Sequence, residues 1–187
     1  MGIVNEPPAA MSRLKYICLR YFAFAAGTST LIVSFIGVLV MVLLVFPALP
    51  IHGDMIDLKL HYNLADIQAA MLQYGPQGRA AYALASPTVD TVFPVLYVTF
   101  FAGLIYRFRP NERLWVMAFI PVFAGAWDLC ENAQITAMLL QYPDISARQV
   151  AMASFFTSTK HLLGAGYELT ALVFLAIYLL RRLKLPK

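Results

Sequence analysis

Four carboxylic acids interrupt stretches of the sequence that are otherwise apolar. Two of them, Asp128 and Glu131, stand three residues apart, and Lys160 with His161 precedes the last of them. Neighbouring carboxyl groups suit proton transfer because their surroundings can drive their pKa values apart, and a lysine or histidine can stabilise developing negative charge. The sequence therefore predicts six candidate catalytic residues: Asp128, Glu131, Asp90, Glu168, Lys160 and His161.

The spacing of these residues gathers them on common helix faces. Residues three, four or seven positions apart share one side of a helix. On this spacing Asp128, Glu131 and Asn132 form one stripe, and Asp90 aligns with Tyr97 on another predicted helix. If the stripes face inwards, the acids meet at one level between helices. The candidate ligand-binding residues beside them are Asn132, Tyr97, Trp127 and Tyr167.

The composition indicates that a membrane surrounds these helices. Of the 187 residues, 60% are hydrophobic and only 13% are charged, a balance outside the range of ordinary soluble domains. A helix needs about 20 apolar residues to cross the hydrocarbon core. We therefore predict an all-α fold, a single-domain integral membrane four-helix bundle, with spans at about 22–49, 88–106, 114–141 and 153–180.

The Lys and Arg residues indicate which way these spans point. Ten of the 14 lie before the first span, between the second and third, or after the fourth. Because positive residues stay on the cytoplasmic side, we predict a multi-pass protein of the plasma (inner) membrane with both termini in the cytoplasm and the acids in the outer half. These cations flank apolar spans instead of forming a basic face, so no nucleic-acid partner is expected.

The predicted outer loop, residues 50–87, is too long for a simple turn. Apolar residues recur at helical spacing over residues 64–74, where Asn63 can cap a helix and Gly75 can stop it. Pro76 can begin a further helical stretch. We expect short helical segments here that cover the bundle or rest on the outer membrane surface.

The acids cannot face lipid as bare charges. Each charged residue at a helix centre costs about 2.5–3.5 kcal/mol to insert, so four unpaired acids would cost on the order of 10 kcal/mol. One lysine and one histidine leave about two negative charges uncompensated. The remaining negative charge can be compensated in several ways: by protons shared between the acids, by a bound cation, by a cationic ligand, or by Arg79 or Arg148 folding in from the loops.

These features favour a protein that binds or transforms a lipid-like hydrophobic molecule by acid/base chemistry. The alternatives are an accessory or assembly subunit of a larger membrane complex, and proton- or cation-coupled transport. A purely structural lock between helices explains the excess of acids less well, and a metal site lacks a specific ligand spacing such as HExxH. Expected partners are membrane lipids, a hydrophobic small molecule, and a membrane-protein partner or second copy of the chain; the sequence identifies no cofactor.

Overall fold

The computed structural model describes residues 12–184 and is helical, with no strand in that range. Its α-helices are α1 (Arg13–Ala25), α2 (Thr28–Val40), α3 (Leu64–Ala85), α4 (Val89–Phe108), α5 (Phe119–Gln141) and α6 (Ala147–Lys184). Shorter helical turns occupy Met41–Val45, Phe46–Ala48, Ile56–Leu58 and Glu112–Ala118. The all-α prediction is confirmed for this part of the chain.

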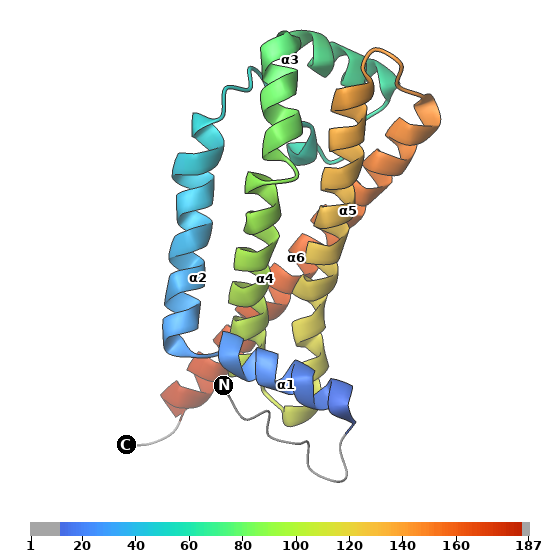
Figure 1. Cartoon of the computed structure of the whole chain (residues 1–187). Helices are drawn as coiled ribbons and strands as arrows, with labels where there is room; N and C mark the ends of the chain where they lie inside the picture. The colour runs from blue at the N-terminus through green and yellow to red at the C-terminus, as the bar shows by residue number, and fades with distance from the viewer. Residues whose placement is uncertain (1–11, 185–187) are drawn as a thin grey trace.

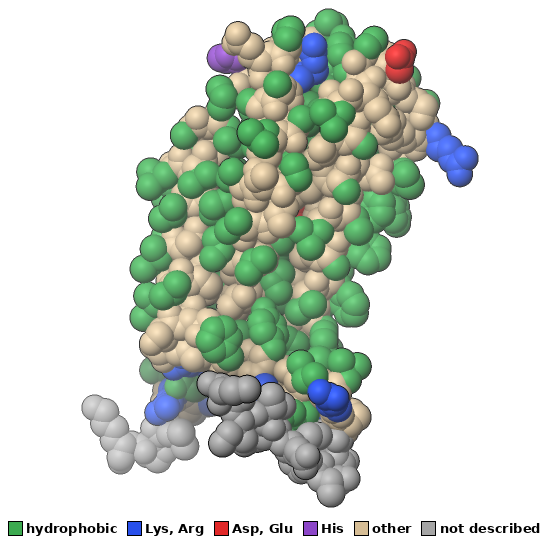
Figure 2. All heavy atoms as spheres, in the orientation of Figure 1, with side chains coloured by type: hydrophobic (Ala, Val, Ile, Leu, Met, Phe, Trp, Pro, Cys, Tyr) green, Lys and Arg blue, Asp and Glu red, His purple; other side chains and the backbone are tan. Residues whose placement is uncertain are grey.

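Four helical segments are long and apolar enough to cross a membrane: Thr28–Ala48, Val89–Phe108, Glu112–Gln141 and Ala147–Leu183. Figure 1 shows α2, α4 and α5 running side by side, with α6 crossing behind them at a steep angle. On the face seen in Figure 2, hydrophobic side chains cover the middle of the molecule, and Lys and Arg side chains lie towards its two ends. This distribution is the one a multi-pass membrane protein requires.

The first membrane-length helix begins later than the sequence predicted. Residues 22–25 of the expected span at about 22–49 belong to α1, which lies across one end of the bundle (Figure 1). The chain turns at Gly27, whose extended backbone begins α2. Phe22 anchors α1 by burying its ring among aromatic rings of α4 and of the chain before α5. Hydropathy alone does not register this turn, because both sides of it are apolar.

The far end of α2 loosens as it approaches Pro47. The backbone N–H of Phe46 bonds to the carbonyl of Met41, five residues back, and Pro47 has no N–H to continue the regular helical pattern. A tighter turn then ends the helix at Ala48. Phe46 and Pro47, where the winding changes, both lie on the wall of a cavity.

Helix α3 covers the end of the bundle opposite α1 (Figure 1). Asn63 caps it: the Asn63 side chain accepts the N–H of Asp66 at 3.1 Å, and the Asp66 carboxylate accepts the N–H of Asn63 at 2.9 Å. The sequence predicted a stop at Gly75 and a further helical stretch from Pro76, and α3 is indeed two helical stretches joined at a kink, where the backbone of Gly75 is not helical. Gly75 has φ 63°, which glycine tolerates, and Pro76 begins the next turn.

Two apolar cores pack the two ends. The α3-end core joins α3 to α5 and α6 through Ile67, Met71, Tyr74, Ile135, Met138 and Val150. The α1-end core joins α1, α4, α5 and α6 through Phe22, Ala102, Ile105, Ala118, Ala171 and Phe174. The ionisable residues lie between these cores.

Candidate functional site

Lys160 of α6 joins the two neighbouring acids of α5. Its Nζ forms an ion pair with Asp128 at 3.4 Å and a closer ion pair with Glu131. Asp128 is 4% exposed and Glu131 is fully buried. The helical spacing of the two acids presents both to one lysine, so the convergence expected from the sequence is present.

Glu131 is enclosed by hydrogen bonds as well as by the lysine. The Thr157 hydroxyl donates to Glu131 Oε1 at 2.6 Å, and the Tyr62 hydroxyl lies 3.0 Å from that of Thr157. Burial raises the pKa of Tyr62, which keeps its hydroxyl protonated as a donor. Thr157 and Tyr62 are themselves buried. Glu131 therefore has no access to a ligand in this arrangement.

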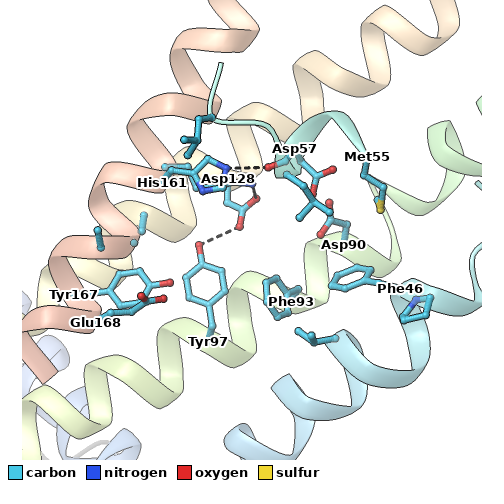
Figure 3. A pocket seen from close by; sticks show the side chains of 18 residues that line it. Phe46, Met55, Asp57, Asp90, Phe93, Tyr97, Asp128, His161, Tyr167 and Glu168 are labelled. Atoms are coloured by element: carbon cyan, nitrogen blue, oxygen red, sulfur yellow. Dashed lines mark hydrogen bonds and ion pairs between the residues drawn. The ribbon is translucent and has the colours of Figure 1, made fainter. Parts of the chain in front are cut away.

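Asp128 faces the other way, into a cavity of about 680 Å³. The cavity lies over α4 between α2 and α6 (Figure 3). Tyr97 of α4 donates its hydroxyl to Asp128 Oδ2 at 3.1 Å, so one oxygen of this acid is held by Tyr97 and the other by Lys160. Apolar and aromatic side chains form most of the wall: Val42, Phe46, Pro47, Met55, Leu58, Leu60, Phe93, Ala124 and Tyr167.

Asp90 lines the same cavity without a partner. It lies in the first turn of α4, where the helix dipole favours negative charge, and is 5% exposed. Among residues 12–184 its carboxylate makes no hydrogen bond and no ion pair. In Figure 3 it lies on the wall formed by Phe93, Phe46 and Met55. Asp90 is therefore the buried acid left available to whatever fills the cavity, whereas Glu168, which also has no partner among the described residues, is exposed.

The loop between α2 and α3 roofs the cavity and adds a carboxylate that the sequence did not single out. A helical turn at Ile56–Leu58 directs Asp57 into the cavity wall, and the Tyr82 hydroxyl of α3 donates to Asp57 Oδ1. Burial raises the pKa of Tyr82 well above its ordinary value of 10.0. His161 Nε2 lies 3.1 Å from the Asp57 carbonyl oxygen, which ties the loop to α6 (Figure 3).

The predicted site residues separate into three groups. Those that line the cavity are Asp90, Asp128, Glu168, Lys160, His161, Tyr97 and Tyr167. Glu131 lies behind them. Two do not reach the cavity: Trp127 packs near Phe156, with ring centroids 6.1 Å apart, and Asn132 is buried with its side-chain amide unpartnered among the described residues.

The sequence left open whether Arg79 or Arg148 folds in from the loops to compensate the acids. Neither does. Arg79 donates to the carbonyl of Met71 at 2.7 Å and lies over the ring of Tyr142, 4.5 Å from its centroid. Arg148 is exposed near the start of α6. Both lie away from the cavity wall, so the negative charge of the pocket remains without a contribution from the loops.

The cavity opens sideways between α2 and α6. Val42 and Pro47 on the α2 edge are exposed, as are Ala165 and Glu168 on the α6 edge. Helix α2 packs on α4 and has no comparable packing against α6. Because these exposed edges belong to membrane-length helices, the opening faces the region that lipid would occupy.

Four polar residues in or directly behind the cavity wall were not predicted from the sequence: Asp57, Tyr62, Tyr82 and Thr157. Thr157 stands three and four residues before Lys160 and His161, so helical spacing could have identified it. The other three belong to the loop and α3, and no local pattern connects them to the acids. In residues 12–184, no cluster of three or more His, Cys, Asp and Glu side chains is arranged to hold a metal ion.

Comparison with protein-family models, curated proteins and solved structures found no match to this chain.

Proposed function

We propose that this membrane protein binds a lipid-like hydrophobic molecule in the cavity between α2, α4, α5 and α6, with the polar end of that molecule at Asp90 and Asp128. One observation carries the proposal: a largely apolar cavity of about 680 Å³ holds two buried carboxyl groups. Volumes of roughly 300–1,000 Å³ with a few convergent polar groups are typical of small-molecule sites.

The wall of the cavity supports a hydrophobic ligand. Phe93 lies 5.3 Å from both Phe46 and Tyr97 between ring centroids, and Tyr97 stacks on Tyr167 at 5.8 Å. These rings give a rigid apolar surface that loses little conformational freedom when a ligand binds. The sideways opening lets such a molecule enter from the bilayer without crossing water.

The two acids support acid/base chemistry with separate roles. Asp128 is held by Lys160 and Tyr97, so it remains in place as a paired carboxylate. Asp90 has neither constraint and is the group that exchanges a proton with the polar end of the ligand. This division would allow the protein to transform its ligand as well as bind it.

The distribution of cations supports a cytoplasmic location for the α1 end. Arg13, Lys15 and Arg20 belong to α1, and the C-terminal end of α6, with Arg181 and Arg182, lies at the same end (Figure 1). In that orientation the cavity opens to the outer leaflet of the plasma membrane.

The packing favours binding over transport. The α1-end core fills its half of the bundle with apolar side chains, including Phe22, Ile105 and Phe174. A proton or cation path across the membrane needs polar groups or water along its length. The ionisable residues of the site stop at this core, which suits a pocket with one opening.

Filling the cavity tests the proposal. A Cβ added at Gly164 would have only the Tyr167 hydroxyl nearby, at 3.9 Å, so Gly164→Leu places an apolar side chain in the cavity and takes up part of its volume. Ala151→Leu, on an exposed position of α6, is the matched control. Mass spectrometry of molecules that co-purify with each protein is the measurement. We expect a stoichiometric hydrophobic species with the wild type and the control, and its loss from Gly164→Leu.

The same species in all three proteins would contradict a ligand in this cavity. Loss of an associated membrane protein, in place of a small molecule, would favour the accessory-subunit alternative. Far-ultraviolet circular dichroism and gel filtration establish that Gly164→Leu is folded before the lipids are compared.

A further inference from the structure

The cavity contains an excess of negative groups. Four acids line it: Asp57, Asp90, Asp128 and Glu168. Among residues 12–184, Lys160 is the one lysine or arginine on its wall, and it is already paired with Asp128 and with Glu131 behind the wall. The positive charge of Lys160 is therefore already paired with two acids of the protein before any ligand binds.

Among the buried acids of the cavity, Asp90 is where this excess is least compensated; Glu168 also lacks a partner in the described residues but is exposed. It is 5% exposed, lines the cavity, and makes no hydrogen bond or ion pair with the part of the chain that the structure describes. Asp57, by contrast, has the Tyr82 hydroxyl as a donor. A carboxyl group that is buried without a partner carries an unmet desolvation cost, which a bound cation would offset.

The surroundings of Asp90 suit an organic cation. The rings of Phe46 and Phe93 meet edge to face, 5.3 Å between centroids, and lie beside Asp90 on the cavity wall (Figure 3). Aromatic faces attract ammonium groups, and this attraction grows when water is excluded. Carboxylate and aromatic rings together are the groups that recognise alkylated ammonium ions.

We propose that the ligand is an amphiphile with a positively charged nitrogen, a protonated amine or a quaternary ammonium, bound between Asp90 and the rings of Phe46 and Phe93. Its apolar chain leaves the cavity between α2 and α6. A protonated amine and a quaternary ammonium both bring the positive charge that pairs with the Asp90 carboxylate. This inference rests on the proposed function and specifies the chemical class of its ligand.

The cavity is less suited to the other head groups. An anionic head would face Asp57 and Asp90, with Lys160 already engaged by two acids. A neutral head would leave the carboxyl group of Asp90 with a hydrogen bond at most. Of the three kinds of head group, only a cationic one offsets the excess negative charge of the cavity. The apolar chain of the same molecule then contacts the apolar wall.

The test compares three single-chain amphiphiles with the same dodecyl tail. Dodecyltrimethylammonium, dodecanol and dodecanoate are added below their micellar concentrations to the purified full chain in a non-ionic detergent. Native mass spectrometry measures the bound fraction for the wild type, Asp90→Asn, Gly164→Leu and the control Asp144→Asn. Asp144 is exposed in the turn between α5 and α6, so its substitution removes one negative charge far from the cavity.

We expect the wild type and Asp144→Asn to bind the ammonium amphiphile at one per chain, at least about tenfold more tightly than the other two, as for a charge-assisted contact. Asp90→Asn should lose that preference and Gly164→Leu should lose binding altogether. Equal affinity for all three, abolished by Gly164→Leu, overturns the cationic ligand and leaves the proposed function standing. Preference for dodecanoate also overturns it. Binding that Gly164→Leu does not reduce contradicts both proposals.

Discussion

Glu131 and Asp90 are both buried acids on membrane-length helices, but the protein treats them differently. Glu131 has a lysine, a threonine hydroxyl and, through that threonine, a tyrosine from the loop. Asp90 faces a cavity and has no partner among the described residues. Burial of an acid in a membrane protein therefore does not by itself mark a functional group; what compensates the acid distinguishes a structural role from a binding role.

This comparison also separates the two faces of Lys160. Towards Glu131 the lysine completes a packed region in which Thr157 and Lys160 hold the two carboxylate oxygens, whereas towards Asp128 it forms part of the cavity wall. Substitutions on the first side should reduce stability, and substitutions on the second should change what the cavity binds. Lys160 itself belongs to both sides.

Replacing Lys160 should have the largest effect on stability. Lys160→Met leaves the carboxylates of Asp128 and Glu131 buried without their cation, and removing one partner of a buried ion pair typically costs about 3–5 kcal/mol. Unfolding in mixed micelles with a rising fraction of dodecyl sulfate measures the loss. Arg148→Met, at an exposed position of α6, should leave stability unchanged within about 0.5 kcal/mol. Adding Glu131→Gln to Lys160→Met should recover part of the loss; no recovery would contradict the pairing.

Neutralising the two acids separately should split stability from binding. Glu131→Gln removes the charge that pairs with Lys160 and should cost about 1.5–3 kcal/mol, the range for hydrogen bonds to charged groups. Asp90→Asn removes a charge with no partner, so we expect no loss of stability and a loss of the bound cationic amphiphile. Unfolding measures the stability of both variants, and native mass spectrometry measures how much of the cationic amphiphile each one binds. If Asp90→Asn destabilises as much as Glu131→Gln, the two acids have the same role.

Helical periodicity and hydropathy predicted the parts of this molecule that depend on local sequence. Four apolar stretches identified the four membrane-length helices, and the three-residue spacing of Asp128 and Glu131 placed both acids on the side that faces Lys160. The sequence did not reveal the turn at Gly27, because the residues directly before and after it are both apolar and hydropathy does not change there. Such a break depends on how Phe22 packs, which is a tertiary property.

The other contacts of the site that could not be predicted from the sequence join residues that are far apart in the chain. Tyr62 meets Thr157 across 95 residues of chain, and Asp57 meets His161 across 104. Neither pair has a spacing rule that connects it. The stripe of Asp128, Glu131 and Asn132 also divides in the fold: one residue faces the cavity, one is enclosed behind it, and Asn132 lies away from both. Residues on one helix stripe span an arc wide enough to meet different neighbours.

Removing the hydroxyl that holds Glu131 should have a moderate effect. Thr157→Val keeps the shape of the side chain but leaves Glu131 Oε1 without its donor, at a cost of about 1–3 kcal/mol. Tyr62→Phe should cost about 1 kcal/mol through the loss of its bond to Thr157. Because both belong to one chain of hydrogen bonds, the double variant should cost less than the sum of the two. Additive losses would show that the tyrosine and threonine act independently.

The tyrosines of the loop and of α3 should give the smallest and most specific signal, a titration that reports how tightly the loop and α3 are packed together. Burial raises the pKa of Tyr62, Tyr74 and Tyr82, so each keeps its proton in the folded protein at a pH where the unfolded chain has lost it. The folded state then binds more protons than the unfolded state as the pH rises through 10.0, and stability falls with further alkalinity. Phenolate absorbance should therefore develop in two stages, with these three tyrosines ionising only as the protein unfolds. If Tyr82→Phe leaves the second stage unchanged while Tyr62→Phe reduces it, the loop is closed over Glu131 but open over Asp57, and the roof of the cavity is its less stable part.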